Sequence, residues 1–329
     1  MRKFKITDQV AKKLKGLDNT AGESYTPVRK ESARDAKGQR ESVYVISRTD
    51  IGLMRGSNQD AVILGYGLMG VADGMGGHNG GEIASATARD GMLREVVDSQ
   101  PDAETLKMAV KKVNTEIFRM QEQDEKLSGM GTTLTLLWPA EEKMLVGHVG
   151  DSRAYLLRDG AFRQVTSDHS MVADMVRRGM LTEEQAATHP MRNYITRAVG
   201  TEEDIQVDLI EMERQRGDRW LVCSDGLHGM VPKERLKELL SEDDLNDGAD
   251  QMIREALEHG GRDNITLVIA EDRTGPERTN EATERSSAKM AEDSGISPEL
   301  TEAAPEATAE NHEPDDGAEK IPPEEGSDE

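Results

Sequence analysis

The sequence is poor in cysteine, in aromatic residues and in long apolar runs. Cys223 is the single cysteine among 329 residues, so an intramolecular disulfide is excluded and a reducing compartment is expected. No uninterrupted apolar run approaches the roughly 20 residues that cross a bilayer, and no secretory signal is recognisable. Aromatic residues make up 3% of the chain, which leaves aliphatic residues and methionine to build the core. These absences predict a cytoplasmic protein without a transmembrane segment.

Positive charge is also scarce, and it is unevenly distributed. The formal net charge is -23. Residues 1–48 carry 12 Lys and Arg against 6 Asp and Glu, whereas residues 271–329 carry 5 against 19. Because the stretch between them is acidic as well, nucleic acid is not expected as a partner.

Composition divides the chain into three parts. Residues 1–41 are a basic extension, in which apolar residues at helical spacing predict a short amphipathic helix over residues 1–18, followed by a linker. Such a helix can pack on its own domain or lie on an anionic membrane. Residues 42–271 have the apolar patterning of a globular domain. Residues 272–329 are expected to be disordered, because they have little apolar surface to bury.

The globular part combines strand-like and helical patterns. Asp159-Gly160 predicts a tight hairpin, and a second hairpin is expected around Gly65-Tyr66-Gly67. Strands are expected at 43–47, 61–64, 68–72, 132–138, 143–149, 153–157, 162–165, 205–210, 219–223 and 264–270. Helices are expected at 81–97, 103–123, 170–190, after Pro232, and around 249–257. Strands in hairpins and helices in pairs favour a layered α+β fold over alternating βαβ units.

One glycine pattern suggests a different protein class. Gly65-x-Gly67-x-x-Gly70 has the spacing of a dinucleotide-binding loop. Such a loop must follow a strand and open a helix, whereas the residues that follow here are strand-like. A nucleotide-binding oxidoreductase is therefore not supported.

Aspartates recur beside small residues at predicted strand ends and in loops. They are Asp60, Asp73, Asp225 and Asp263, with Asp151 as a fifth. Each one alone is best explained as a cap or turn residue. Gathered together, they would repel one another unless cations neutralised them, and oxygen-only ligands favour Mg²⁺ or Mn²⁺ over zinc. A pair of such ions activates water and binds a phosphoryl group.

Two neighbours of these aspartates could contribute to the same site. Gly74 has no Cβ, so its carbonyl can turn inward as a further oxygen ligand. Arg55, five residues before Asp60, could bind a phosphate through its planar fork of N–H donors.

The order of these motifs is that of a known family. The sequence resembles the metal-dependent Ser/Thr protein phosphatases of type 2C, in their compact bacterial form. The resemblance covers roughly 42–271 and implies a four-layer α-β-β-α sandwich, with two antiparallel sheets flanked by helix pairs and the metal ions at one end between the sheets. The matching stretches are RGSNQDA (55–61), VADGMGG (71–77), GTTLTLL (131–137), VGDSRAYLLRDG (149–160), TSDHS (166–170), CSDGL (223–227) and GGRDNITLV (260–268).

The resemblance also implies a role for each site residue. Asp73 should bridge two Mn²⁺ or Mg²⁺ ions and the Gly74 carbonyl should bind one of them, while Asp225 and Asp263 hold the other. Asp60 would act mainly through metal-bound water, and Arg55 matches the phosphate-binding arginine. Asp151 and Asp225 match a third, weaker metal site, and residues 168–198 match a mobile flap. The expected catalytic residues are Arg55, Asp60 and Asp73, and the expected metal ligands are Asp60, Asp73, Gly74, Asp151, Asp225 and Asp263.

One position departs from some members of that family. Met75 stands where they carry a histidine that serves as general acid, and its thioether cannot transfer a proton. His78, the nearest alternative, is expected to be a surface loop residue. The other histidines considered, His148, His169 and His228, are expected to be structural. The identity of the proton donor therefore stays open.

The function implied by the resemblance is Mn²⁺- or Mg²⁺-dependent hydrolysis of phosphoserine and phosphothreonine in proteins. Family members of this form commonly oppose a membrane-bound Ser/Thr kinase, and the enzyme is expected to be a monomer that acts on phosphoproteins. A catalytically dead phosphatase fold that docks partners through its tails is the alternative. Intact carboxylates and Arg55 argue against it. Preference for phosphothreonine or phosphotyrosine is left open.

Overall fold

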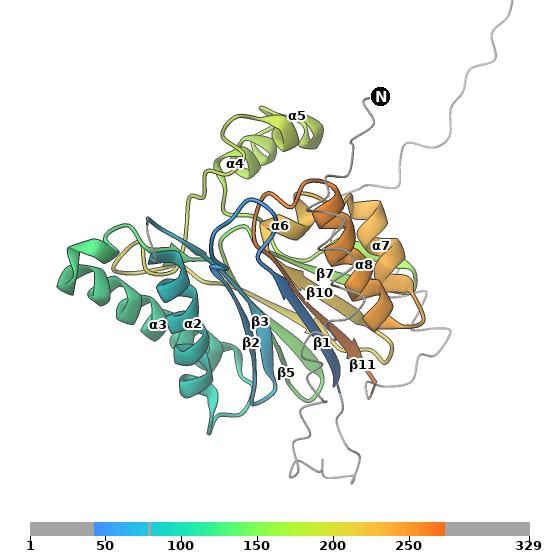
Figure 1. Ribbon diagram of the computed structural model, residues 1–329. Helices are drawn as coiled ribbons and strands as arrows, with labels where there is room; N and C mark the ends of the chain where they lie inside the picture. Colours follow the sequence, from blue (N-terminus) through green and yellow to red (C-terminus); the bar gives the residue numbers. More distant parts are fainter. Residues whose placement is uncertain (1–42, 78–79, 274–329) are drawn as a thin grey trace, which may run out of the picture. The chain divides into compact units, whose positions relative to one another are not determined.

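The computed structural model, which describes residues 43–77 and 80–273, contains two antiparallel sheets (Figure 1). The strands run in the orders β1–β11–β10–β7–β8 and β2–β3–β5–β6–β9, and the short β4 pairs with β3. Their bounds are β1 (Val43–Asp50), β2 (Asp60–Gly65), β3 (Leu68–Met75), β4 (Gly131–Thr132), β5 (Leu134–Pro139), β6 (Lys143–Val149), β7 (Arg153–Arg158), β8 (Ala161–Gln164), β9 (Asp208–Glu213), β10 (Arg219–Cys223) and β11 (Ile265–Asp272).

Helices cover the outer face of each sheet. The pair α2 (Gly80–Val96) and α3 (Ala103–Gln123) packs on the sheet that contains β2 and β3, and the pair α7 (Lys233–Ser241) and α8 (Leu245–Glu258) packs on the other (Figure 1). The four-layer α-β-β-α sandwich predicted from the sequence is thus confirmed. The shorter helices are η1 (Glu125–Leu127), α4 (Met171–Arg177), α5 (Glu183–Thr188) and α6 (Asp225–His228).

The apolar core has three parts, one between the sheets and one under each helix pair. Strand β10 contributes to two of them: Trp220 and Val222 lie between the sheets, whereas Leu221 and Cys223 face α7 and α8. This division follows from the alternation of side chains along a strand. Because both faces are covered, β10 reads in the sequence as an uninterrupted apolar run.

The hairpin of β2 and β3 has a two-residue turn. Tyr66 and Gly67 both have positive φ, 52° and 78°, as the tightest hairpin turns require. The turn sets Gly65 opposite Leu68, and the same register sets Asp60 opposite Asp73. The sequence predicted this hairpin but ended the second strand at Ala72. In the structure β3 continues to Met75, so Asp73 lies inside the strand.

The strands predicted over 132–138 and 205–210 also differ from the structure. The strand expected over 132–138 is interrupted at Thr133, whose N–H turns to the Asp73 carbonyl at 2.8 Å. The strand expected from residue 205 begins only at Asp208. Residues 200–203, which precede it, form a turn held by the buried side chain of Asn114. At Thr133 a long-range hydrogen bond outweighs the local apolar pattern, whereas β9 begins late because its pairing with β6 starts at Asp208, opposite His148.

Two ion pairs are buried at the end of β11 that is distant from residues 263–265. Arg158 contacts Asp218 at 2.8 and 2.6 Å, and Arg214 contacts Asp272 at 2.6 Å. All four side chains are at most 6% exposed. Since Asp272 is the last residue of β11, this strand ends on a carboxylate that is neutralised by the buried guanidinium of Arg214.

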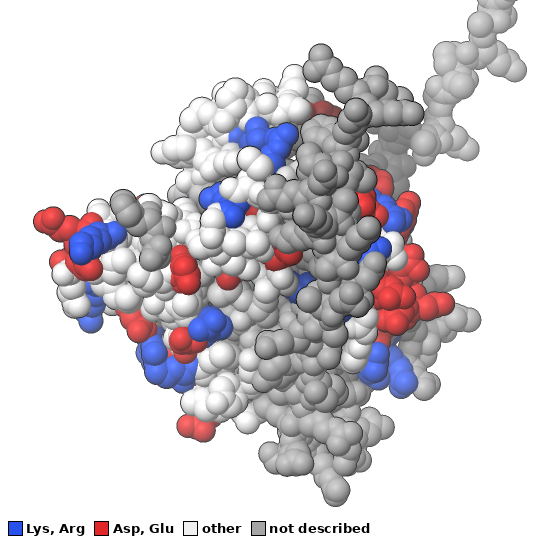
Figure 2. Space-filling view, in the orientation of Figure 1, with Lys and Arg blue, Asp and Glu red and all other residues white. Residues whose placement is uncertain are grey.

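Acidic side chains outnumber basic ones around the end of α7 and the start of α8. Figure 2 shows red side chains gathered where these helices lie in Figure 1, and Glu234, Glu238, Glu242 and Asp243 line a depression there together with Lys237 and Ser241. Such a surface repels the phosphates of nucleic acids.

No helix within the described residues is long and apolar enough to cross a bilayer. The predicted N-terminal helix, the linker and residues 274–329 of the tail lie outside the described residues.

Candidate active site

The aspartates singled out in the sequence come together at one end of the two sheets. Asp60 and Asp73 are directly opposed on β2 and β3, so their side chains share one face. Asp225 begins α6 two residues after the end of β10, and Asp263 lies two residues before β11. Asp151 follows β6 by two residues. Asp73 is close enough to the other four for each of them to raise its pKa.

The cluster holds more negative charge than the protein neutralises. Burial and then the neighbouring carboxylates Asp60, Asp225, Asp151 and Asp263 raise the pKa of Asp73 well above its ordinary value. Burial, followed by Asp263, raises the pKa of Asp60 to about 6 and that of Asp225 to about 7. Burial and Asp225 raise the pKa of Asp151 to about 8. Ionised carboxylates packed in this way need cations.

The oxygen atoms of the cluster suit divalent cations that keep part of their water. Oδ1 of Asp60 is buried and accepts no hydrogen bond from the described residues, while its Oδ2 accepts one from Ser224 Oγ at 2.8 Å. Within the described residues no three His, Cys, Asp or Glu side chains form a cage around a single ion. Mg²⁺ and Mn²⁺ favour oxygen ligands, and Mg²⁺ retains several waters and takes few protein ligands. The residues present therefore fit such ions, and they do not offer zinc the closed set of ligands that it prefers.

The main chain around Asp73 is held on both sides. Asp73 N donates to Thr133 Oγ1 at 3.0 Å, and the Asp73 carbonyl accepts from Thr133 N and Thr132 Oγ1. At Gly74 a Cβ would lie 2.0 Å from the carbonyl oxygen of Gly81. Glycine is required there because β3 and the start of α2 touch through their main chains.

Arg55 lies at the rim of the cluster. It belongs to the loop of residues 51–59 between β1 and β2, and its Nη2 donates to Asp263 Oδ2 at 2.6 Å. The Arg55 side chain is 47% exposed. One nitrogen is thus engaged by Asp263, while the exposed part of the guanidinium faces solvent beside the carboxylates.

His228 contacts the loop of Asp151 through its ring. Its Nε2 lies 3.0 Å from the Asp151 carbonyl oxygen, which can only accept, so Nε2 carries the proton. Burial lowers the pKa of His228 to about 3, which keeps the ring neutral. This ring therefore orients main chain, in agreement with the structural role expected from the sequence.

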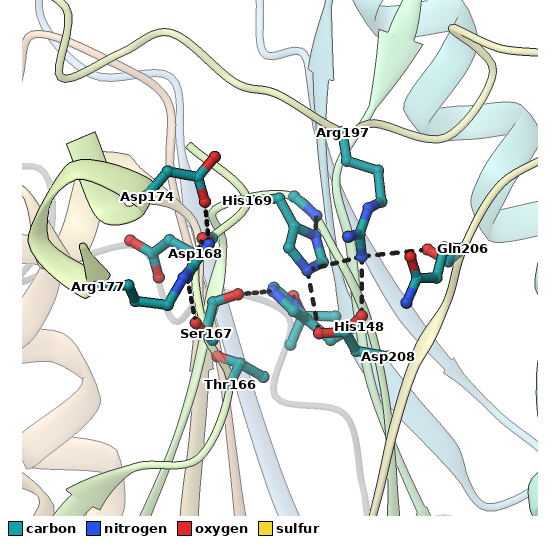
Figure 3. A network of polar contacts seen from close by, with 12 residues as sticks. His148, Thr166, Ser167, Asp168, His169, Asp174, Arg177, Arg197, Gln206 and Asp208 are labelled. Carbon is teal, nitrogen blue, oxygen red and sulfur yellow. Dashed lines mark hydrogen bonds and ion pairs between the residues drawn. The ribbon is translucent and has the colours of Figure 1, made fainter. Parts of the chain in front are cut away.

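His148 and His169 are part of a polar network (Figure 3), which contacts the loop of Asp151 through Gly150. His169 Nδ1 accepts from Gly150 N at 3.0 Å, so its Nε2 carries the proton and donates to Asp208 Oδ2 at 3.1 Å. Arg197 Nη1 donates to Asp208 Oδ1 at 2.8 Å. Burial lowers the pKa of His148 to about 4. Both rings thus have a structural role. The carboxylate of Asp208 accepts hydrogen bonds from two segments of the chain, at His169 and at Arg197.

The network is at the base of residues 168–198, which the sequence predicted to be a flap. Its two ends are paired, with Thr196 N donating to the His169 carbonyl at 2.8 Å, and its helices α4 and α5 stand apart from both sheets (Figure 1). Asp168, at the first end, contributes to the raised pKa of Asp151. The segment therefore begins beside the carboxylate cluster, and its mobility stays a prediction.

Met75 is the last residue of β3, and its methyl group lies near Gly131. His78, the nearest other candidate for the general acid, lies outside the described residues.

Several residues that shape the site received no role from the sequence. Ser224 and Thr133 contact Asp60 and Asp73, as described above. Asn264 is 3% exposed and directs its side chain to the loop of Arg55. Its position directly after Asp263 in a motif was the available signal. Asp208 and Arg197 stood in no motif and gave none.

The protein phosphatase 2C family model matches residues 56–265 of the chain. The serine/threonine protein phosphatase PstP of Mycobacterium tuberculosis is 40% identical over 228 residues, a match that covers 68% of this chain and 44% of PstP. The chain thus spans less than half the length of that relative. The serine/threonine phosphatase stp of Listeria monocytogenes is 38% identical over 240 residues, covering 68% of this chain and 94% of stp.

Solved structures agree with these sequence matches. The catalytic domain of the serine/threonine protein phosphatase PstP, in complex with two manganese ions, has a TM-score of 0.66 and 37% identity, covering 70% of this chain and 99% of that chain. The serine/threonine phosphatase Stp1 from Staphylococcus aureus has a TM-score of 0.67 and 32% identity, covering 70% of this chain and 96% of that chain.

Proposed function

The chain belongs to the protein phosphatase 2C family, and from this premise we propose that it hydrolyses phosphoserine and phosphothreonine in proteins with the help of two Mn²⁺ or Mg²⁺ ions. The observation that carries the proposal is the cluster of Asp60, Asp73, Asp225 and Asp263, with the guanidinium of Arg55 at its rim. The relatives named as serine/threonine phosphatases and the manganese-bound PstP structure support it.

Each carboxylate has a role in this proposal. Asp73 would hold both ions, since each of the other four carboxylates is near enough to raise its pKa. The Gly74 carbonyl would hold one ion, and Asp225 and Asp263 would hold the other. Asp60 would act through water, which fits its buried Oδ1. Asp151 would form a third, weaker site together with Asp225, which is near enough to raise the pKa of Asp151.

The ions, when bound, supply the positive charge that activates a water and stabilises the phosphoryl group. The protein supplies orientation. Asp263 holds one nitrogen of Arg55, and the remaining N–H donors of the planar guanidinium would bind the phosphate. The fixed main chain of Asp73 keeps the bridging carboxylate in place.

Biological context extends the proposal. The relatives named above are bacterial serine/threonine phosphatases. We propose that the enzyme acts on phosphoproteins and opposes a Ser/Thr kinase that phosphorylates them. A monomeric, cytoplasmic enzyme is proposed, and the free and buried Cys223 supports a reducing compartment. The sequence placed the catalytic domain at residues 42–271, but β11 continues to the buried Asp272, so we propose that the domain includes this residue. Residues 1–41 are proposed as a basic extension, and the residues after the end of β11 as an acidic tail.

Turnover of matched phosphothreonine and phosphotyrosine peptides with Mn²⁺ tests the function. The parent enzyme should release phosphate from the phosphothreonine peptide, and Asp73→Asn should abolish the reaction together with calorimetric Mn²⁺ binding. The peptide pair also decides the open question of specificity. Full activity in Asp73→Asn would refute the assignment of the site, and an inactive parent would favour the alternative of a docking protein.

A further inference from the structure

The loop that carries Arg55 needs support from the rest of the protein. Met54, Arg55 and Gly56 at its tip are exposed, and a loop with an exposed tip is mobile unless its main chain is anchored. A bidentate contact with a phosphate requires the guanidinium in one orientation, and the long arginine stem does not supply it alone. The position of residues 51–59 therefore decides what Arg55 can bind.

Asn264 anchors this loop on both sides of Arg55. Its Nδ2 donates to the carbonyl oxygens of Ile51 at 2.9 Å and Ser57 at 3.0 Å. Its Oδ1 accepts from Gln59 N at 2.8 Å. Two acceptors and one donor around the amide permit a single orientation, so the side-chain oxygen and nitrogen cannot be exchanged.

The same residue connects the loop to both of its neighbours in the site. Asn264 N donates to Asp263 Oδ1 at 2.8 Å, while Oδ2 of that carboxylate accepts from Arg55. Gln59, which the Asn264 amide holds, accepts from Gly74 N at 3.1 Å through its own carbonyl. The amide thus lies between the main chain of the Arg55 loop and the carboxylate cluster.

We propose that Asn264 is a positioning residue for phosphate binding, which fixes residues 51–59 so that Arg55 presents its guanidinium beside Asp263. The inference rests on the proposed function and adds a residue that positions Arg55 for phosphate binding. Misplacement of a binding group by about 1 Å can reduce a rate by roughly 100-fold. Loss of the clamp should therefore lower phosphate affinity by about 10- to 100-fold.

The chain offers a matched control. Asn114, on α3, is 1% exposed and makes the same three contacts with another loop. Its Nδ2 donates to the carbonyls of Glu202 and Glu203, and its Oδ1 accepts from Gly200 N. Asn114→Ala thus removes the same number and kind of hydrogen bonds as Asn264→Ala without touching the loop of Arg55.

The first experiment does not depend on catalysis. Trypsin cleaves after exposed arginines, and cleavage at Arg55 requires residues 51–59 to leave their clamped position. Asn264→Ala should accelerate cleavage after Arg55 at least about tenfold, whereas Asn114→Ala should leave that rate unchanged. Equal cleavage rates in Asn264→Ala and the parent would overturn the proposal.

The second experiment is a double-mutant cycle with Arg55→Ala in the Mn²⁺-loaded enzyme. Inhibition by inorganic phosphate should weaken about 10- to 100-fold in Asn264→Ala, but less than about twofold when Arg55 is already alanine. Asn114→Ala should lower the melting temperature comparably and leave phosphate inhibition unchanged. A loss that is the same with and without Arg55, or that Asn114→Ala reproduces, would make Asn264 merely structural.

Failure of this inference is distinguishable from failure of the proposed function. If the protein does not hydrolyse phosphopeptides but Asn264→Ala still accelerates cleavage after Arg55, the proposed function is refuted and the role of Asn264 in holding the loop stands. If the protein hydrolyses phosphopeptides but cleavage after Arg55 is unchanged in that variant, the proposed function stands and the role of Asn264 is refuted.

Discussion

Removal of divalent cations should make the stability of the domain fall as pH rises. Asp225 and Asp151 have pKa values raised by burial to about 7 and about 8, against an ordinary value of 3.8. A carboxyl group whose pKa is higher in the folded state binds protons more tightly there than in the unfolded chain. Its contribution is therefore complete at low pH and is lost as pH rises through the folded pKa.

In the window from pH 6.5 to pH 8 this effect is larger than the opposing one. The lowered pKa values of His148 and His228, about 4 and about 3, make stability rise with pH, but the unfolded histidines are already half deprotonated at pH 6.5 and lose only their remaining protons above it. Each additional proton held by the native state changes the free energy of unfolding by about 1.4 kcal/mol per pH unit. After the opposing contribution of the histidines, the metal-free protein should lose a net of about 1 kcal/mol between pH 6.5 and pH 8.

Urea unfolding after chelation measures this slope, and the same titration with saturating Mg²⁺ is the comparison. Bound ions replace the protons, so Mg²⁺ should stabilise the protein most at pH 8 and reduce the slope. Asp151→Asn, which stays neutral, should also reduce the slope in the metal-free protein. Stability that rises with pH after chelation, or that Mg²⁺ does not change, would refute the view that uncompensated carboxylates crowd this site.

Other changes test individual residues. Arg55→Ala should lower kcat/KM for phosphopeptides by a factor equivalent to about 2–4 kcal/mol of transition-state stabilisation. Arg55→Lys should recover only part of that loss, because an ammonium group cannot reproduce the planar fork of N–H donors. Kinetics like those of the parent enzyme in both variants would place the phosphate elsewhere. Asp151→Ala should slow phosphopeptide hydrolysis more than nitrophenyl phosphate hydrolysis, since nitrophenolate leaves without protonation; equal losses would exclude a role in proton delivery. Asp272→Ala should destabilise the protein by about 3–5 kcal/mol in urea unfolding, because it leaves Arg214 buried without its carboxylate. Deletion of residues 274–329 preserves that pair and should leave the unfolding midpoint and catalysis unchanged; a large drop would show that the tail packs on the domain.

Local sequence patterns were sufficient to predict the elements whose bounds are set by their own caps and apolar residues. The predicted helix over 103–123 has the bounds of α3, because Asp102 caps it and its apolar face repeats at helical spacing. Strand β10 also has its predicted bounds, since an apolar run buried on both faces is hard to mistake. The five aspartates and Arg55 were found through motif order, and the structure brings them to one end of the sheets.

Contacts between distant residues were not predictable in this way. The partners of the Asn264 side chain lie 205 to 213 residues away in the sequence, so no local window contains them. Thr133 interrupts an apolar run because its partner is Asp73, 60 residues earlier. Asp208 joins both ends of residues 168–198, and neither its spacing nor its neighbours indicated this.

The two-residue turn at Tyr66 and Gly67 determines which residues can meet at the opposite end of the hairpin. Every pair along β2 and β3 is counted from this turn, up to Asp60 opposite Asp73. One inserted residue in the turn would shift β2 against β3 and reverse the face to which Asp60 points, because side chains alternate along a strand. A segment that never touches substrate thus has no freedom in length. In this fold, the pairing of Asp60 with Asp73, two carboxylates of the proposed metal site, is set by the length of a turn at the far end of the hairpin.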